Sequence, residues 1–448
     1  MHRMAKITAP SHRGIVPRER LFTRLDAGLQ KQVVWISSPG GSGKTSLVTS
    51  YLNHRKLPHL WYRIDSGDDD AATFFYYMGL ASKKVSPKFK KPLPLLTPEY
   101  LEGIPVFTRR YFEEMFRRLK APFVLVFDNG QDVPETSVLH ESLKIGFETL
   151  PKGISVLVVS RNAPPSAYAR MQLNSAMDSL SWNDIRLDRE ETESIVRLKN
   201  NEDIRDMPVG LLHERTGGWV AGLVLLMEAL RKQGTVNLAM GHQAKEEIFP
   251  YFASELFYKT DRSIQEFLVH TCFLPVMTAD MARALTGNPE SEAILKRLYE
   301  HNHFTERRME GVPNYLYHTL FRDFLMERAH AMLSPDAIRD LRVKAAAVLM
   351  GAHLVEDAAG LLMDAKDFQA LASVIRQHAP NLVTQGRSLV LAGWIDALPD
   401  YYFSADPWLS YWKGTALFSH RILESRACLE RAFHAFNENG DDTGVLLS

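Results

Sequence analysis

Short apolar runs alternate with amphipathic stretches between about residue 15 and residue 184. Four runs have the length and composition of buried strands: Val33–Ser37, Leu60–Asp65, Phe123–Asp128 and Ser155–Ser160. The stretches between them include Ala72–Ala81 and Thr108–Lys120, which have the pattern of amphipathic helices. Short buried strands separated by helices are typical of a parallel sheet with helices on both faces. We therefore predict an α/β domain over residues 1–184.

A segment rich in lysine and proline, Lys83–Thr97, interrupts this domain. Prolines and clustered charges favour a loop over a packed element. We expect a surface loop, and docking of a partner on it is the alternative to a purely structural role.

Strand patterns largely stop after Asp188, which stands three residues before Glu191 as in a capping box. The run Thr216-Gly217-Gly218-Trp219 then breaks the pattern before a strongly apolar helix from Val220 to Leu230. We predict a helical domain over residues 185–245.

Three short helices are expected between Phe267 and His301, followed by two strands within Phe304–Tyr317 and a helix over Thr319–Met332. The turn between the strands falls at Gly311-Val312-Pro313. Helices followed by a small hairpin predict a winged-helix domain over residues 246–332. The alternative is a helical domain of no particular class.

From Ala337 onward the pattern is helical throughout, with short polar breaks. The expected helices are Ala337–Leu349, Val355–Met363, Phe368–His378, Ser388–Ala397, Pro407–Leu417 and Ile422–Asn437. Small and large apolar residues in the last two helices are spaced within about one residue of a tetratricopeptide repeat. We interpret residues 333–448 as a helical arm and the start of tetratricopeptide-like repeats. The apolar run Gly444–Leu447 has the pattern of one more helix beginning, and we expect a longer protein.

The most specific chemistry lies in Ser38-Pro39-Gly40-Gly41-Ser42-Gly43-Lys44-Thr45, between the first strand and a helix start. Glycines let successive backbone N–H groups point at phosphate oxygens, and the helix N-terminus adds positive charge. Lys44 would reach the β- and γ-phosphates, and the Thr45 hydroxyl would hold Mg²⁺. Ser38 departs from the P-loop pattern, which usually has glycine there. The candidate nucleotide-binding residues are Pro39, Gly40, Gly41, Ser42, Gly43, Lys44, Thr45 and Ser46.

Two further strand ends complete the candidate site. The apolar strand Phe123–Asp128 ends in an acid, as a Walker B strand does, so Asp128 is the second expected Mg²⁺ ligand. Asn129 follows where hydrolytic relatives carry a second acid, and an amide cannot accept a proton from water. Gln131 or Asp132 could substitute, yet we expect slow ATP hydrolysis at most. Arg161, after the fourth strand, is placed to sense a γ-phosphate, and the alternative is a solvated arginine at a strand end.

The composition of the chain argues against several kinds of partner and site. Lys plus Arg and Asp plus Glu each number 53, so charge gives no support for a polyanion partner. The two cysteines, Cys272 and Cys428, are expected to be reduced core thiols. No apolar stretch approaches 18 residues. We therefore expect a cytoplasmic protein without a membrane partner.

The order of motifs resembles the STAND class of signal-transducing P-loop ATPases. Within that class it is similar to the large bacterial transcription activators related to the maltose-regulon activator. The segments that carry the resemblance, besides the P-loop, are Val16-Pro17-Arg18-Glu19-Arg20-Leu21, Trp61–Asp65, Phe127-Asp128-Asn129, Ser160–Pro165, Thr216–Leu223 and Tyr317–Leu325. They span nearly the whole chain.

The resemblance implies several roles. The backbone near Val16 and Arg18 would flank the adenine, and His318 would contact the β-phosphate of ADP; a local hydrogen bond is the alternative for His318. Trp219 would lie near the nucleotide or simply in the core. ADP would hold a closed state, whereas ATP and an inducer bound at the C-terminal repeats would open it and cause self-association. The close relatives usually carry two acids at the Walker B end, so Asn129 puts turnover in doubt.

Three functions follow from these expectations. The first is the regulatory ATPase part of a transcription activator, with DNA contacted through a region outside this chain. DNA contact by Arg307 and Arg308 of the winged-helix segment is a minor alternative. The second is a STAND ATPase that drives a defence or signalling effector. The third, an ordinary turnover ATPase, is disfavoured by Asn129.

Overall fold

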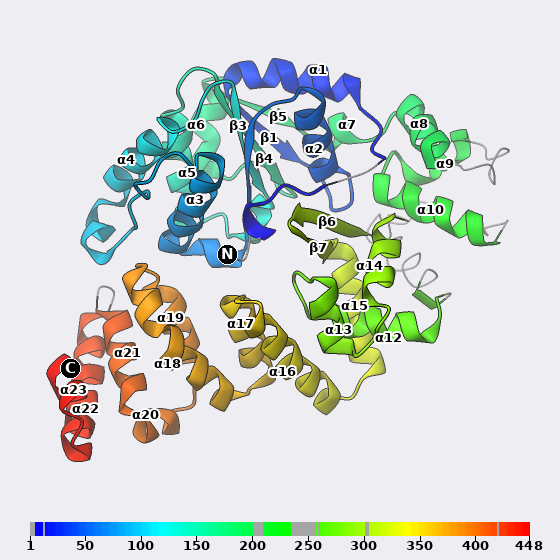
Figure 1. Cartoon of the computed structure of the whole chain (residues 1–448). Coiled ribbons are helices and arrows are strands. Elements are labelled where there is room, and N and C mark those ends of the chain that lie inside the picture. The colour runs from blue at the N-terminus through cyan, green and yellow to red at the C-terminus, as the bar shows by residue number, and fades with distance from the viewer. Residues whose placement is uncertain are drawn as a thin grey trace.

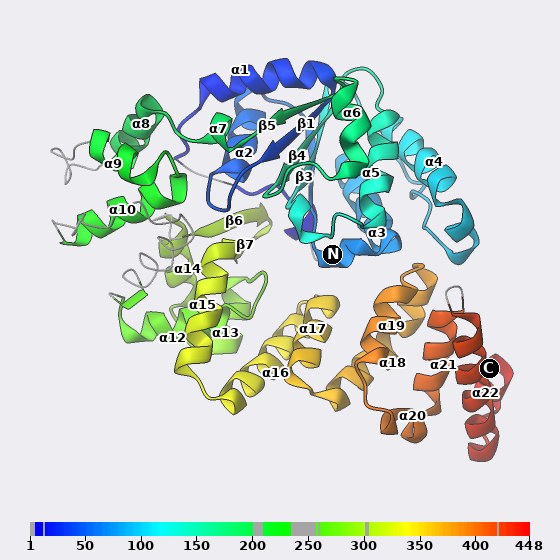
Figure 2. The same ribbon diagram turned by 180° about the vertical axis from the view of Figure 1, so that it is seen from behind.

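The computed structural model describes residues 5–11, 14–199, 209–233, 257–258, 260–300, 304–418 and 421–448. Figures 1 and 2 show that the chain follows a curved path, and its C-terminal helices return toward the α/β domain where the chain begins. The four predicted parts are therefore not arranged in a line. The C-terminal helices lie near the α/β domain although they are far from it in sequence.

The α/β domain is built on a five-stranded parallel sheet in the order β2-β3-β4-β1-β5. The strands are β1 Val33–Ser37, β2 His59–Arg63, β3 Phe123–Asp128, β4 Ile154–Ser160 and β5 Met177–Leu180. Side chains alternate between two apolar clusters: Val33 and Trp35 face one, whereas Val34 and Ile36 face the other. Burial on both faces is the reason that these strands are almost wholly apolar.

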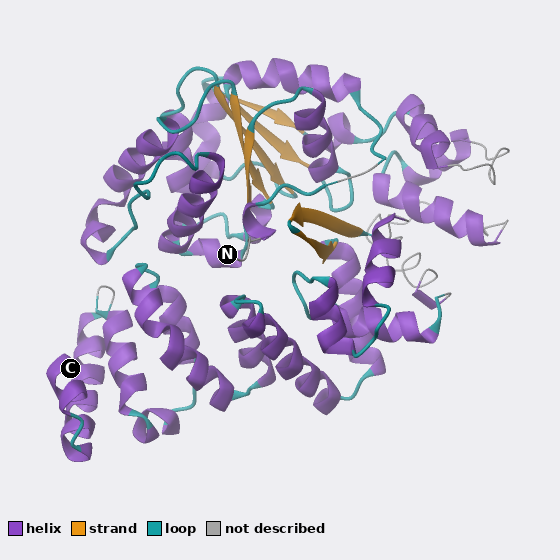
Figure 3. Cartoon of the chain, viewed as in Figure 1, coloured by secondary structure: helices purple, strands orange, loops and turns teal. Residues whose placement is uncertain are grey.

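Helices cover both faces of this sheet (Figure 3). The first apolar cluster includes residues of α3 Ala71–Val85, α4 Ile104–Phe116, α5 Val138–Glu148 and α6 Ala169–Leu173. The second includes residues of α1 Glu19–Gly28, α2 Lys44–His54 and α7 Trp182–Ile185. The predicted fold class is therefore confirmed for this part of the chain.

Local differences from the sequence-based expectations have identifiable causes. Strand β5 was not predicted, because its four residues include two polar ones and the run is too short to show a period. Strand β2 ends before Asp65, whose carboxylate instead accepts the Gly67 N–H at the start of a short 3₁₀ helix. The expected loop Lys83–Thr97 begins inside α3, and Leu93 and Leu96 within it are buried.

Within its described residues, the helical part contains α8 Arg189–Lys199, α9 Val209–Thr216 and α10 Val220–Gln233. Its predicted capping box forms: Asp188 accepts the Glu191 N–H at 2.7 Å, and Glu191 accepts the Asp188 N–H at 3.1 Å. The predicted limit at residue 184 falls inside α7, and the limit at 245/246 lies outside the described residues. These domain limits stay predictions.

Between residues 260 and 332, the described part of the winged-helix segment contains three helices, a hairpin and a long helix, in the predicted order. Strands β6 Thr305–Glu310 and β7 Val312–Tyr317 pair antiparallel around Gly311, which has a φ of +85°. Helix α15 covers Thr319–Met332, as predicted. The preceding helices are α12 Arg262–Thr271, α13 Ala279–Thr286 and α14 Ser291–Glu300.

All six helices expected after Ala337 form, and the structure contains two further short ones. They are α16 Pro335–Gly351, α17 Val355–Ala365, α18 Phe368–Thr384, α19 Ser388–Asp396, α20 Tyr401–Ala405, α21 Pro407–Leu417, α22 Ile422–Asn439 and α23 Asp442–Leu447. Helix α20 was not expected from the sequence, whereas α23 contains the apolar run Gly444–Leu447 that was interpreted as a helix start. Gly414 of α21 and Ser425 of α22 approach closely, since the Ser425 hydroxyl donates to the Gly414 carbonyl at 2.7 Å.

An N-terminal strap, residues 5–11, joins the α/β domain to the hairpin. The Lys6 ammonium lies 2.7 Å from a carboxylate oxygen of Asp65 and 2.9 Å from one of Asp68. On the other side, Arg308 of β6 donates to the Ala5 and Thr8 carbonyls. The strap therefore ties the α/β domain to the hairpin, which lies about 300 residues further along the chain than the strap itself.

The C-terminal helices contact the α/β domain through a group of polar side chains. Arg387 donates to the Thr73 hydroxyl at 3.0 Å and pairs with Glu356 at 2.6 Å, and Glu356 also accepts the Tyr77 hydroxyl. Gly386 has a φ of +77°, and an added Cβ would lie 2.1 Å from the Leu96 carbonyl oxygen. Only glycine fits this close approach.

Both cysteines are free thiols, but only Cys272 belongs to the core. Cys428 is partly exposed on α22, so the expectation of a core thiol is wrong there. None of the described helices is long and apolar enough to cross a bilayer.

Candidate functional site

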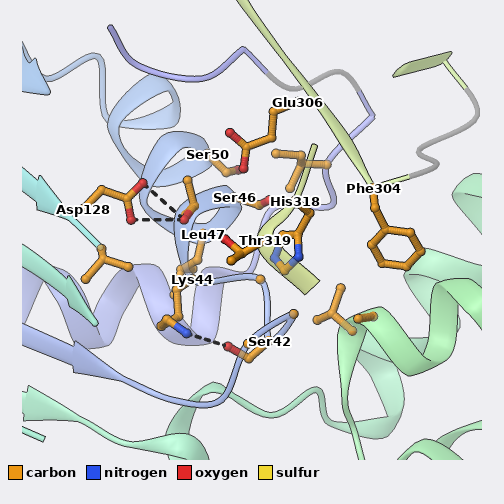
Figure 4. Close-up of a pocket in the computed structure, with 18 of the residues that line it drawn as sticks. Ser42, Lys44, Ser46, Leu47, Ser50, Asp128, Phe304, Glu306, His318 and Thr319 are labelled. Carbon is orange, nitrogen blue, oxygen red and sulfur yellow. Dashed lines mark hydrogen bonds between the residues drawn. The ribbon is translucent and has the colours of Figure 1, made fainter. Parts of the chain in front are cut away.

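A cavity of about 270 Å³ lies where the C-terminal edge of the sheet meets α10, the hairpin and the start of α15. Figure 4 shows side chains from these elements pointing into it. Nearly all the candidate residues from the sequence line it: Val16, Arg18, Gly40, Gly41, Ser42, Gly43, Lys44, Thr45, Ser46, Asp128, Asn129, Arg161 and His318. Pro39 is the candidate that does not.

The P-loop needs glycine for two reasons: its backbone has positive φ values, and neighbouring residues leave no room for a side chain. Gly41 and Gly43 have φ values of +71° and +84°, which side chains disfavour. A Cβ on Gly41 would lie 2.6 Å from the Cβ of Ala221. The loop therefore curls tightly, and the helical part packs directly on it.

Lys44 points back over the loop. Its ammonium donates to the carbonyls of Ser38 at 2.5 Å and Pro39 at 3.0 Å. It also lies 3.5 Å from the Ser42 hydroxyl, to which it donates (Figure 4). Burial lowers the pKa of Lys44 to about 8, an effect that Asp128 opposes and Arg161 reinforces. Ser38, the departure from the usual pattern, bonds Ser42 at 2.5 Å across the loop. It therefore contributes a side-chain contact that glycine would lack.

Thr45 and Asp128 come together as the sequence predicts. The Thr45 hydroxyl donates to the two carboxylate oxygens at 3.3 and 3.4 Å. The pKa of Asp128 is raised to about 6, chiefly by burial and then by Glu306, whereas Arg308 and Arg63 oppose the rise. A hydroxyl beside a single carboxylate suits Mg²⁺, which typically keeps waters and shares nucleotide phosphates.

The residues after Asp128 form a hydrogen-bonded cluster. Asn129 adopts the left-handed conformation with a φ of +66°, which asparagine tolerates, and its amide donates to Asp132 at 3.2 Å. Gln131 donates to Asp132 at 2.8 Å and accepts the Arg161 backbone N–H at 3.0 Å. Of the two possible substitutes for a second acid, Gln131 lines the cavity.

Arg18 is committed to protein contacts. Its buried guanidinium donates to the Ile185 carbonyl at 2.6 Å and to Glu191 at 2.7 Å. Burial raises the pKa of Glu191, but the pairing with Arg18 outweighs it and the pKa is lowered. The Arg18 side chain therefore anchors the helical part beside the cavity, while Val16 lines the cavity wall.

His318 stands at the start of α15 with its ring directed into the cavity (Figure 4). Its backbone N–H donates to the Phe304 carbonyl at 2.6 Å. The ring Nδ1 is buried and has no hydrogen-bond partner among the described residues. Burial lowers the pKa of His318 to about 4; Glu306 opposes this, and Arg161, Lys44 and Arg63 add to it. The imidazole is therefore neutral and holds an unused polar atom in the site.

Trp219 lies in the core and also contacts the P-loop. It is only 3% exposed and belongs to the large apolar cluster of the winged-helix and C-terminal parts. Its indole N–H also donates to the Gly40 carbonyl at 2.9 Å. Next to it, the Ala221 N–H donates to the Gly41 carbonyl at 2.9 Å.

Sequence reasoning missed two charged residues of the cavity, Arg63 at the end of β2 and Glu306 on β6. A charged residue that ends an apolar strand was the available signal for Arg63. Arg308 also lines the cavity, but it is 2% exposed and holds the strap, so its side chain is not presented to DNA. Arg307 lies over the Tyr299 ring at 5.7 Å.

The residues that line the cavity have the chemistry needed to hold a nucleotide. Gly41 and Gly43 have positive φ values that allow the loop to curl, Lys44 and Thr45 lie at the helix start, and the His318 ring keeps a buried nitrogen without a partner among the described residues. A phosphate would meet the cationic and N–H donors, and Mg²⁺ would meet Thr45 and Asp128.

Comparisons with known proteins bear on the family and the fold of the chain. The family model described as the MalT winged helix domain matches residues 253–337. The chain is 25% identical to the HTH-type transcriptional regulator MalT of Vibrio cholerae, over 99% of this chain and 48% of the relative. It is 23% identical to MalT of Cronobacter sakazakii, over 96% and 48%. The chain thus spans about half the length of these curated relatives.

The fold has a solved counterpart. A crystal structure of a STAND protein with a tetratricopeptide repeat sensor from Pyrococcus horikoshii matches 95% of this chain and 59% of that chain, with a TM-score of 0.68 and 14% identity. Taken with the MalT relatives, this confirms the resemblance drawn from the motifs. The chain is MalT-like and has the fold of a STAND P-loop ATPase.

Proposed function

We propose that this chain is the nucleotide-gated regulatory part of a bacterial transcription activator. It would bind an adenine nucleotide and Mg²⁺ in the cavity, with ADP favouring a closed form. ATP and an inducer would favour an open form that self-associates. The observation that carries the proposal is the buried, unpartnered Nδ1 of His318 in the same cavity as Lys44, Thr45 and Asp128.

Each residue has a defined part in this proposal. Lys44 and the loop N–H groups would hold the β- and γ-phosphates, and Thr45 and Asp128 would hold Mg²⁺. Val16 and the backbone of Arg18 would flank the adenine. His318 would contact the β-phosphate of ADP from the winged-helix part. Because that residue comes from a different part of the chain, ADP would bridge the two parts and hold them together.

Hydrolysis would be slow, because Asn129 cannot act as a base and Asp132 is already bonded to two amide groups. A switch does not need rapid turnover; it needs a ligand with different affinities for the two forms. Arg161 would read the γ-phosphate. The inducer would bind at the C-terminal helices, and DNA would be contacted by a region outside this chain.

The likeness to MalT regulators along nearly the whole chain favours transcription over the alternative, a STAND ATPase that drives a defence or signalling effector. The two can be separated by the sequence of the full-length protein: a DNA-binding domain supports transcription, and an enzymatic effector domain supports the alternative.

The test is to denature the purified chain and identify any released nucleotide by ion-pair chromatography. We expect ADP in a near-stoichiometric amount. A protein that releases no nucleotide is then titrated with ADP and ATP in the presence of Mg²⁺. Failure to bind either nucleotide would overturn the proposal.

A further inference from the structure

Three neighbouring strands end in a row of charged residues at the carboxyl edge of the sheet. Strands β2, β3 and β4 lie side by side and end at Arg63, Asp128 and Ser160, and Arg161 follows directly. Arg63 and Asp128 face each other in the strand register. Ligands of open α/β sheets bind outside this edge. The sheet therefore presents Asp128 between two arginines at this edge, and all three residues line the cavity.

The side chains of Arg63 and Arg161 differ from the other cationic side chains of the cavity. Lys44 donates to loop carbonyls, Arg18 pairs with Glu191, and Arg308 holds the strap. In contrast, no residue of the described ranges forms a hydrogen bond or ion pair with the guanidinium of Arg63 or of Arg161. An arginine that is partly buried beside a cavity without a partner is available for a ligand.

The electrostatic influence of Arg63 extends across this part of the cavity. Its charge opposes the burial that raises the pKa of Asp128 and of Asp132, and it adds to the burial that lowers the pKa of His318. Arg161 acts in the same direction on His318 and Asp132. The two arginines thus act on the same small region, and neither is neutralised by an ion pair with a described residue.

We propose that Arg63 binds the terminal phosphate of a nucleoside triphosphate and sets the preference for triphosphate over diphosphate. The inference rests on the proposed function. The P-loop follows β1, and β4 and β3 separate β1 from β2. The first two phosphates belong at the loop, so only a third phosphate extends toward Asp128 and Arg63. A guanidinium matches phosphate oxygens with paired donors, which a lysine cannot do.

The experiment compares Arg63→Gln and Arg63→Lys with the parent chain after bound nucleotide has been removed. Arg109→Gln, an exposed arginine on α4 away from the cavity, is the matched control. Affinities for ADP and for the non-hydrolysable analogue AMP-PNP are measured with Mg²⁺ by titration calorimetry. Circular dichroism checks that each variant is folded.

We expect Arg63→Gln to weaken AMP-PNP binding about tenfold while ADP binding changes by less than about twofold. Arg63→Lys should lie between the parent and Arg63→Gln, because it keeps the charge but loses the paired donors. Equal losses for the two nucleotides, or no loss, would overturn the role of Arg63 and leave the proposed function intact. A parent chain that binds neither nucleotide would overturn both.

Discussion

The indole N–H of Trp219 donates a 2.9 Å hydrogen bond to the carbonyl of Gly40. This bond joins the start of α10 to the P-loop across 179 positions of sequence. The neighbouring bond from Ala221 to Gly41 has the same direction and length. The helical part thus holds the outer side of the loop, and loop conformation becomes coupled to the packing of α10.

Replacement of Trp219 by phenylalanine tests this coupling. The change keeps an apolar ring but removes the donor, which leaves the Gly40 carbonyl unpaired. We expect a loss of about 1 kcal/mol in the free energy of unfolding, measured in urea, and weaker nucleotide binding. Trp412→Phe, on α21 away from the cavity, is the control and should leave nucleotide affinity unchanged. Unaltered affinity in the Trp219 variant would show that the loop does not need this bond.

Lys44 and Asp128 should separate phosphate binding from metal binding. Lys44→Ala removes the buried ammonium at the loop, and we expect nucleotide affinity to fall roughly a hundredfold. Asp128→Ala should instead retain metal-free binding and lose the dependence on Mg²⁺. Both are measured by titration with and without EDTA, and the exposed Lys152→Ala serves as the control. Full Mg²⁺ dependence in the Asp128 variant would contradict the assignment of the metal site.

Acidification should destabilise the structure through His318. Burial lowers its pKa from the ordinary value of 6.5 to about 4, so the folded protein holds the neutral ring. The unfolded chain takes up a proton below pH 6.5, and this contribution to stability is lost as the pH falls from 6.5 toward 4. We expect a loss of about 1 kcal/mol per pH unit across that window.

The measurement is the free energy of unfolding at several pH values for the parent chain and for His318→Asn. Asparagine is a favoured residue at a helix N-cap, and its side chain does not titrate. As the pH falls, the free energy of unfolding should decrease more steeply for the parent chain than for the variant. Parallel curves would mean that the imidazole is accessible to protons in the folded protein.

The N-terminal strap should depend on the charge of Lys6. Its ammonium is bound by Asp65 and by the fully buried Asp68. Removing one partner of a buried ion pair leaves an uncompensated charge, so Lys6→Met should cost about 3 kcal/mol of stability. It should also make the strap susceptible to limited proteolysis.

A second substitution provides the control for Lys6. Asp68→Asn in the Lys6→Met background removes the stranded charge and should recover part of the lost stability. A double variant that is as unstable as the sum of the two single variants would rule out the ion pair as the cause.

Features formed by residues adjacent in the chain could be predicted from the sequence alone. Gly41, Gly43, Lys44 and Thr45 are adjacent in the chain, so their spacing by itself predicted a loop between a strand and a helix. The same holds for helix α15, whose limits were predicted to the residue. Strand β5 shows where such reasoning ends, because a four-residue strand is specified by its pairing with β1 and not by its own pattern.

Tertiary structure decided which distant residues share the cavity. Motif likeness suggested His318, but only packing places it beside Lys44 with a buried, unpartnered nitrogen. Arg63 and Glu306 carried little signal, since a charged residue at a strand end is ordinary until its neighbours are known. The physical reason is that sequence periodicity reports which face of an element is buried, whereas charge pairing and cavity shape depend on contacts between elements that packing alone brings together.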